Sequence, residues 1–553
     1  MRLIRLWLTD RERPPLRDLL LLFIIFGFSF FQSLGRFPLI DPDEGRYAEI
    51  PREMLERSDF VTPLLNYVKY FEKPPLHYWL NAIAMSIFGR NEFAARFSGA
   101  LMGLLAVLLV YHAGRRLFGR RSGLFAALIL GTCTGFLVQA RLDITDMTLT
   151  CTLSAALAFF IVAARKGERH PGRYYYLSYL CAALAVLAKG LIGIVFPGAI
   201  IFLYLLFTRR WRLLKEMHLP TGMLLFFAVS APWFIMISMR NPEFARFFFI
   251  HEHFERFTST VHGRYQPLWF FVPVLLGTML PWSLFIPASI RGIWTGRTTR
   301  DGDVRLYLLI WAAFIFLFFS KSDSKLVPYI LPVFPPLALL AGDVLSRALD
   351  TGFRPLRLQA YLAGGITAIL GAGIILYPHL AHGPAFGAVD GAVIGGLFLA
   401  EGVSALICAR REKGLALLVT LCLFSYLLGI VAPPVILGGI AEHKSPRKFA
   451  QLIRERGGSD AIIASFGISQ GLSFYTERRV VVVGDRNELE FGSKLGDQSA
   501  WFIDPHQFRT LWDGEKPVFA VLGDGELKQL QGTVKAPLNE LARNSRRILI
   551  TNR

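Results

Sequence analysis

Apolar segments of about twenty residues recur along the first 435 residues, and they restrict the fold more than any other feature of the sequence. A helix of that length crosses the hydrocarbon core of a bilayer. The composition agrees, because 53% of the residues are hydrophobic and only 18% are charged, against about 25% in soluble domains. The sequence therefore predicts a polytopic all-α membrane protein. We read thirteen spans, centred near residues 26, 102, 130, 155, 181, 200, 229, 279, 311, 334, 368, 396 and 424.

The basic residues indicate which way the chain crosses the membrane. A net charge of +19 is compatible with a nucleic-acid partner, but the basic residues lie in short clusters between apolar segments. Every second connection is basic, as in "HAGRRLFGRR", "RKGERHPGR" and "RRWRLLKE". This is the pattern of cytoplasmic loops, so we expect no nucleic-acid partner and a cytoplasmic N-terminus. Thirteen spans then place the C-terminus on the outer side.

Two regions on the outer side are longer than simple connections. The first loop, residues 36–90, contains "PDEGRYAEIPREMLER" and "PLHYWLNAIAMSIFG", which we read as amphipathic helices in the interface plane. Residues 439–553 have a soluble composition. "SPRKFAQLIRERGG" predicts a helix, and "AIIASFG", "RRVVVVG", "AWFIDP", "PVFAVLG" and "RRILITN" predict strands. We therefore expect a transmembrane domain, 1–438, and a small α/β domain, 439–553, with a structural or substrate-covering role.

The stretch "DPDEGRY" directly follows the first span. Asp41 or Asp43 could cap a helix that begins near Pro42. Capping needs one carboxylate, whereas this turn holds several together with Arg46. A functional interpretation is that Asp43 is a general base, or a carboxylate that orients an acceptor hydroxyl or phosphate.

Further polar residues lie in the other outward connections. "YFEKPPLHYW" places Glu72 and Lys73 before two prolines, which suits a lysine held against a lipid phosphate. A lysine that reaches to the interface is the alternative. The other polar residues on this side are Asp143 and Asp146 at the start of the fourth span, Lys189, His251, Glu252, His253, Arg256, Lys321, Lys325 and Tyr329.

Carboxylates and cations on one face suit one kind of chemistry. Cationic side chains bind a lipid phosphate, and carboxylates assist the transfer of a group to or from it. The pattern indicates an enzyme that uses a polyprenyl-phosphate-linked donor at the outer leaflet. A transporter or flippase is a second possibility, but we find neither an internal repeat nor charges at mid-membrane depth.

An ordered set of motifs resembles the bacterial aminoarabinose transferases, which are GT-C glycosyltransferases related to the protein O-mannosyltransferases. The set consists of "DPDEGRYAEIPREML", "YFEKPPLHYWL", "LAKGLIGIVFP", "FFFIHEHFERF", "FFVPVLLGTMLPW" and "SKLVPYILP". The resemblance covers about residues 15–345. It implies a multi-pass enzyme of the Gram-negative inner membrane with a periplasmic active site. It also implies transfer of 4-amino-4-deoxy-L-arabinose from undecaprenyl phosphate to a lipid A phosphate, which confers polymyxin resistance.

The resemblance also assigns roles to residues. It implies catalytic carboxylates at Asp43, Asp146 and Glu72, with Asp143 an alternative to Asp146. The residues that it implies for substrate or lipid-phosphate binding are Arg46, Tyr47, Lys73, Lys189, Lys325 and Tyr329, and the cations of the outer face add Arg256 to this set.

The sequence supports no cofactor. "HEHFERF" is not a HExxH motif, so we expect no required metal, although Glu72, His251 and His253 could bind adventitious zinc. We expect a monomer. The alternative within the same class is another polyprenyl-phosphate-dependent GT-C enzyme that moves mannose or galacturonate to a lipid, glycan or protein.

The topology can be tested with reporter fusions. A periplasm-active reporter fused after Arg553 is expected to be active, and the same reporter inserted into "RKGERHPGR" is expected to be inactive. The reverse pattern would contradict both the topology and a periplasmic active site.

Overall fold

The computed structural model describes residues 14–255, 266–295, 302–381 and 386–553, and it divides into two compact units. The first unit consists of residues 1–32 and 99–435, and the second consists of residues 33–98 and 436–553. The sequence grouped the first loop with the membrane-spanning part. In the structure this loop belongs instead to the same unit as the C-terminal domain.

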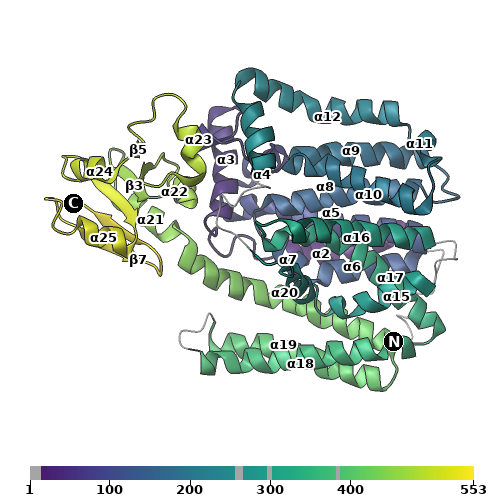
Figure 1. Ribbon diagram of the computed structural model, residues 1–553. Helices are drawn as coiled ribbons and strands as arrows, with labels where there is room; N and C mark the ends of the chain where they lie inside the picture. The colour runs from purple at the N-terminus through teal and green to yellow at the C-terminus, as the bar shows by residue number, and fades with distance from the viewer. Residues whose placement is uncertain (1–13, 256–265, 296–301, 382–385) are drawn as a thin grey trace. The chain divides into compact units, whose positions relative to one another are not determined.

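The first unit is helical throughout its described part (Figure 1). Its α-helices are α2 (Pro15–Phe31), most of α5 (Glu92–Phe118), α6 (Arg120–Thr132), α7 (Thr134–Gln139), α8 (Thr145–Ala163), α9 (Pro171–Lys189), α10 (Ile192–Thr208), α11 (Leu213–Glu216), α12 (Leu219–Arg240), α14 (Phe271–Thr278), α15 (Ile286–Thr295), α16 (Gly302–Lys321), α17 (Phe334–Thr351), α18 (Arg357–Leu380), α19 (Ala388–Arg410) and most of α20 (Gly414–Lys444). Its other helices are a π-helix, η1 (Arg246–Glu255), and the 3-10 helices η2 (Trp282–Phe285), η3 (Val327–Val333) and η4 (Arg354–Leu356).

Within the described residues, eight helices are long and apolar enough to cross a membrane. A ninth span results if residues 271–278 and 282–291 form one bent span. These two segments are bent by 108°, so the predicted span near residue 279 is not one continuous helix. Pro281 lies at this break. Proline lacks a backbone N–H and therefore removes a helical hydrogen bond, which favours a break in the helix. The count of thirteen remains a prediction.

The helices of this unit differ in how much of their surface protein covers. In α8, 89% of the apolar window is buried inside the unit, whereas the corresponding share in α12 is 28%. The exposed part of α12 carries large apolar side chains such as Leu224 and Met239. Because apolar surfaces of this extent are unfavourable in water, α12 has the character of a lipid-facing helix.

The C-terminal part of the second unit is a doubly wound α/β domain. Its sheet has the order β5-β4-β3-β6-β8-β7. The strands are β3 (Ile462–Phe466), β4 (Val481–Val483), β5 (Phe502–Ile503), β6 (Val518–Leu522), β7 (Asn539–Arg543) and β8 (Ile548–Thr551). The first four in spatial order are parallel, and β8 and β7 are antiparallel to their neighbours.

Helices cover both faces of this sheet. They are α21 (Arg447–Arg456), α22 (Gln470–Thr476), α23 (Glu490–Ser493), α24 (Pro505–Trp512), α25 (Asp524–Leu530) and the 3-10 helix η5 (Asn487–Leu489). On one face Phe508, Trp512 and Leu530 of α24 and α25 pack on the strands. On the other face the packing residues are Phe449, Ile453 and Leu472 of α21 and α22. Strand residues alternate between the two cores, as pleated strands require.

The first loop forms α3 (Asp43–Arg57), a small hairpin of β1 (Leu64–Leu65) and β2 (Val68–Lys69), and α4 (Leu76–Phe88). Both helices lie where the sequence predicted helices. However, α3 is buried continuously from Glu44 to Met54, which differs from the expected helix in the interface plane. It packs on α4 and on α22 of the C-terminal domain.

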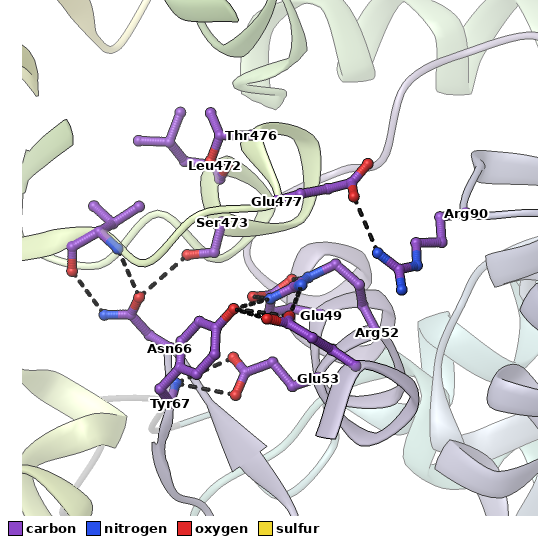
Figure 2. Close-up of polar contacts among 12 residues, drawn as sticks. Glu49, Arg52, Glu53, Asn66, Tyr67, Arg90, Leu472, Ser473, Thr476 and Glu477 are labelled. Atoms are coloured by element: carbon purple, nitrogen blue, oxygen red, sulfur yellow. Dashed lines mark hydrogen bonds and ion pairs between the residues drawn. The ribbon is translucent and has the colours of Figure 1, made fainter. Parts of the chain in front are cut away.

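Ion pairs allow the charged residues of α3 to be buried. Arg52 donates from Nε and Nη2 to the two carboxylate oxygens of Glu49, at 2.6 and 2.7 Å, and from Nη1 to Glu56 at 2.5 Å (Figure 2). Glu53 accepts from the backbone N–H of Tyr67. Arg52 thus compensates the buried carboxylate of Glu49, whereas burial and the neighbouring Glu49 raise the pKa of Glu53 well above its usual range.

Close backbone contacts join the first loop to the C-terminal domain. A Cβ added at Gly45 would lie 2.4 Å from the backbone nitrogen of Gly471, so glycine at this position permits α3 to approach α22. The amide of Asn66 donates to the carbonyl of Val480 at 2.8 Å and accepts from its N–H at 2.9 Å (Figure 2). These contacts hold together the two chain segments of the second unit, residues 33–98 and 436–553.

Asp41 makes a further contact of this kind and does not cap α3. The residue before α3 is Pro42, and no side chain caps this helix. The carboxylate of Asp41 instead accepts from the N–H of Gly471 at 2.9 Å and from the hydroxyl of Ser469 at 3.2 Å. Burial raises the pKa of Asp41 to about 7, although these two donors and Arg547 oppose the shift.

The raised pKa of Asp41 predicts a pH-dependent stability. The folded protein holds this proton more tightly than the unfolded chain, so its contribution to the free energy of unfolding is lost as pH rises from about 4 to about 7. Asp41→Asn has no such proton. The melting temperature of the wild type is therefore expected to fall relative to that of Asp41→Asn between about pH 4 and about pH 7.

The exposed Asp497→Asn is the control, and it should follow the wild-type trend. A constant difference between wild type and Asp41→Asn across this range would contradict the assignment.

Candidate active-site residues

Three acidic residues, Asp41, Asp43 and Glu44, lie at or just before the start of α3, and their environments differ. Glu44 is buried and accepts from Arg96, with Nε–Oε1 at 2.8 Å and Nη2–Oε2 at 2.7 Å. The same guanidinium donates to the carbonyls of Leu34, Phe37 and Pro38, so this pair organises the chain that enters α3. Glu44 is thus a structural carboxylate.

Asp43 is the exposed carboxylate of the three. It is the first residue of α3, and 56% of its side chain is exposed. Its Oδ1 lies 3.3 Å from Nη1 of Arg46, one helical turn further along. An exposed carboxylate beside a guanidinium can contact a substrate without first leaving a buried ion pair.

Arg46 lies between Asp43 and the C-terminal domain. Its Nη2 is 2.5 Å from Oε2 of Glu488, and its Nε is 3.1 Å from Oε1 of the same residue. Gln470 donates to Oε1 of Glu488 at 2.6 Å. Burial raises the pKa of Glu488, while Arg46 and Gln470 oppose this. Neither Glu488 nor Gln470 was identified from the sequence, because neither belongs to a recognisable motif.

Aromatic residues surround the polar part of the first loop. The ring of Tyr47 packs edge-on against His77, with centroids 5.6 Å apart, and lies 6.2 Å from the ring of Tyr78. The hydroxyls of Tyr70 and Tyr78 are buried and have no hydrogen-bond partner among the described residues. Such hydroxyls can donate to a bound polar molecule.

Glu72 and Lys73 are both half-buried and lie just after Tyr70. The ammonium of Lys73 donates to the backbone carbonyl of Glu72 at 2.9 Å. The position before Pro74 keeps Lys73 out of α4, as the sequence predicted. The first loop therefore brings together five predicted residues, Asp43, Arg46, Tyr47, Glu72 and Lys73, in the second unit.

A separate group of predicted residues lies in the membrane unit. Asp146, in the first turn of α8, accepts from the ammonium of Lys189, at the end of α9, at 2.5 Å. That ammonium also lies 5.2 Å from the centroid of the Tyr329 ring. The side chains of Asp146 and Lys189 are 14% and 12% exposed, respectively, whereas Asp143 is fully buried. The exposure favours Asp146 over Asp143 as the residue that could meet a substrate.

The remaining predicted residues are less available or lie outside the described residues. Lys325 is buried, and its ammonium donates to the carbonyls of Gln266, at 2.7 Å, and Ser322. Arg256 and the side chains of His251 and His253 are outside the described residues. In the part of the chain that the structure describes, no three His, Cys, Asp or Glu residues are arranged to hold a metal ion.

Two family models match the chain. Residues 72–236 match the dolichyl-phosphate-mannose-protein mannosyltransferase family, and residues 449–552 match the aminoarabinose transferase C-terminal domain. Among curated proteins, the chain is similar to two undecaprenyl phosphate-alpha-4-amino-4-deoxy-L-arabinose arabinosyl transferases. The one from Edwardsiella ictaluri is 31% identical over 88% of this chain and 89% of its own length. The one from Erwinia tasmaniensis is 31% identical over 89% and 90%.

A comparison with solved structures also finds similarity to an aminoarabinose transferase. The structure of ArnT from Cupriavidus metallidurans bound to undecaprenyl phosphate matches with a TM-score of 0.86 and 32% identity, over 97% of this chain and 98% of that chain. An oligosaccharyltransferase from Archaeoglobus fulgidus matches with a TM-score of 0.52 and 14% identity, over 86% of this chain and 65% of that chain. The second likeness concerns the fold alone.

Proposed function

Since the chain belongs to the undecaprenyl phosphate-aminoarabinose arabinosyl transferases, we propose that it transfers 4-amino-4-deoxy-L-arabinose from undecaprenyl phosphate to a lipid A phosphate. One observation carries this proposal. The chain matches the undecaprenyl-phosphate-bound ArnT structure along 97% of its length, so both the membrane unit and the C-terminal domain are shared. The reaction takes place at the periplasmic face of a bacterial inner membrane, and the enzyme acts as a monomer.

The transfer replaces one phosphate oxygen by another at the sugar. The bond between the anomeric carbon and the undecaprenyl phosphate oxygen breaks, and a bond to a lipid A phosphate oxygen forms. The attacking oxygen is already anionic, so it needs little deprotonation. Asp43 then orients the acceptor or stabilises the oxocarbenium-like sugar rather than acting as a strong base. Its 56% exposure supports a direct contact with substrate.

The cations stabilise the leaving phosphate. Undecaprenyl phosphate departs with its negative charge, and guanidinium or ammonium groups reduce the cost of that charge. In the first loop this role falls to Arg46, which lies over the ring of Tyr47, and to Lys73, with Glu72 as a further carboxylate. Arg256 is assigned to the same role from the sequence.

Asp146 and Lys189 form the polar pair of the membrane unit. Asp146 orients the ammonium of Lys189, and Tyr329 limits its movement through a cation–π contact. We assign Lys189 to phosphate binding and Asp146 to the second catalytic carboxylate. Lys325 contributes only if its ammonium exchanges a carbonyl partner for the phosphate.

A second candidate is transfer of another sugar by the same chemistry. The mannosyltransferase family match over residues 72–236 favours it, because that segment contains Glu72, Lys73, Asp146 and Lys189. The mass of lipid A from cells with and without this protein separates the candidates. A gain of one pentosamine supports aminoarabinose transfer to lipid A, and an unchanged lipid A contradicts it.

Asp43→Asn tests the catalytic carboxylate. The change is nearly isosteric and exposed, so the protein is expected to fold and insert normally while sugar transfer is abolished. The measurement is polymyxin resistance of a strain that carries only this variant, together with its lipid A mass. Asp59→Asn, in the same loop, is the matched control and should retain activity within about twofold. Near-normal resistance with Asp43→Asn would show that this carboxylate has no catalytic role.

Chelation tests whether side chains alone neutralise the lipid phosphate. Transfer in purified membranes is expected to persist in EDTA, because Arg46, Lys73 and Lys189 supply fixed positive charge, each contact contributing about 1.5–3 kcal/mol. Complete loss of activity that zinc, magnesium or manganese restores would assign the phosphate to a metal ion instead.

A further inference from the structure

Two contacts between the C-terminal domain and the first loop lie at the carboxyl ends of parallel strands of its sheet. Ser469 follows the carboxyl end of β3, and Glu488 follows the carboxyl end of β4. In doubly wound sheets, ligands bind outside the carboxyl ends of the parallel strands. Here these strand ends contact two side chains of the first loop. Ser469 donates to Asp41, and Glu488 forms an ion pair with Arg46. The domain therefore binds a segment of its own chain at the place where related folds bind small molecules.

Of these two contacts, the ion pair between Arg46 and Glu488 is the one whose geometry fixes the orientation of a side chain. Both oxygens of Glu488 accept from the guanidinium, at 2.5 and 3.1 Å, in a bidentate arrangement that fixes its plane. The side chains of Arg46 and Glu488 are each 10% exposed, and Gln470 holds Oε1 of Glu488 at 2.6 Å. The third nitrogen, Nη1, is thereby directed to Asp43 at 3.3 Å.

We propose that Glu488 is a positioning residue for sugar transfer and that it acts through Arg46. The proposal rests on the function proposed above. Glu488 holds the guanidinium in one orientation, and the guanidinium in turn holds Asp43 and contacts the donor phosphate. The C-terminal domain thus contributes to the reaction without touching a substrate. A displacement of about 1 Å in a reacting group lowers rates by as much as about a hundredfold, so the loss of this support is measurable.

A second ion pair between the same two segments provides a matched control. Arg90 of the first loop donates to Glu477 of the C-terminal domain at 3.0 Å, and each side chain is 38% exposed (Figure 2). Exposed pairs of this kind contribute little to stability. Glu477→Gln therefore removes a charge from the same interface without affecting Arg46.

The test compares four full-length variants with the wild type: Glu488→Gln, Arg46→Gln, the double variant with both changes, and Glu477→Gln. Initial rates are measured with undecaprenyl-phosphate-linked aminoarabinose and lipid A, together with melting temperatures. Glu488→Gln is expected to lose about ten- to a hundredfold in rate, and Glu477→Gln should stay within about twofold. The double variant pairs two neutral amides, so it should melt close to the wild type but remain as slow as Arg46→Gln alone.

Three results would overturn the proposal. The first is a Glu488→Gln rate within about twofold of the wild-type rate. The second is that Glu488→Gln lowers the rate by the same factor in the wild type and in Arg46→Gln. The third is that the double variant recovers both its rate and its melting temperature. The last result would mean that the pair serves only folding. If Glu488→Gln does not fold, Gln470→Ala replaces it, since it removes only the amide that holds Glu488. Its smaller loss should disappear when Arg46 is already Gln.

Failure of the proposed function gives a different result. If the wild type moves another sugar from the same lipid carrier, the aminoarabinose assignment is wrong, and the comparison run with that sugar still decides the role of Glu488. If the wild type transfers no sugar, both proposals fail.

Discussion

The guanidinium of Arg46 is the group on which the arrangement of the first loop depends. It is held by Glu488 on one side and lies beside Asp43 on the other. A buried ion pair of this kind contributes little net stability, because desolvation of the two charges offsets their attraction. Its value here is orientation, since it directs one nitrogen of Arg46 towards an exposed carboxylate. The neighbouring contacts at Asp41, Asn66 and Gly45 bring the two chain segments close enough for the pair to form.

Under the proposed function, lipid substrates explain why these charges directly follow the first apolar helix. The phosphates of undecaprenyl phosphate and lipid A lie at the depth of the headgroups, so the groups that act on them must lie at that depth as well. In this proposal the carboxylates and the guanidinium of "DPDEGRY", which follows the first apolar helix in the sequence, act at that depth. The membrane unit supplies a comparable pair where α8 begins and α9 ends, in Asp146 and Lys189. Both sets contain an ion pair between a carboxylate and a cationic side chain.

The sequence predicted much of this arrangement and missed what depends on distant partners. Charge density after an apolar segment singled out Asp43 and Arg46 as candidates, and strand-like stretches located β3, β4, β5, β6 and β8. Strand β7 was missed, because "NELAR" is charged and mostly exposed at the sheet edge. Glu488, the partner of Arg46 in the C-terminal domain, lies 442 residues away in η5, where nothing local in the sequence distinguishes it from a solvated glutamate. For the same reason Asp41 was read as a helix cap, although its partner Gly471 is 430 residues away. Pro281 was a visible signal for the break near residue 279, but the apolar residues around it outweighed it.

The central claim is that this protein itself moves aminoarabinose between two lipid phosphates. The most direct measurement uses the purified protein in liposomes with undecaprenyl-phosphate-linked aminoarabinose and lipid A, with the products identified by mass spectrometry. The account predicts that lipid A gains one pentosamine and that undecaprenyl phosphate is released in equal amount. Release of free aminoarabinose without modified lipid A, or no reaction of this donor, would contradict it.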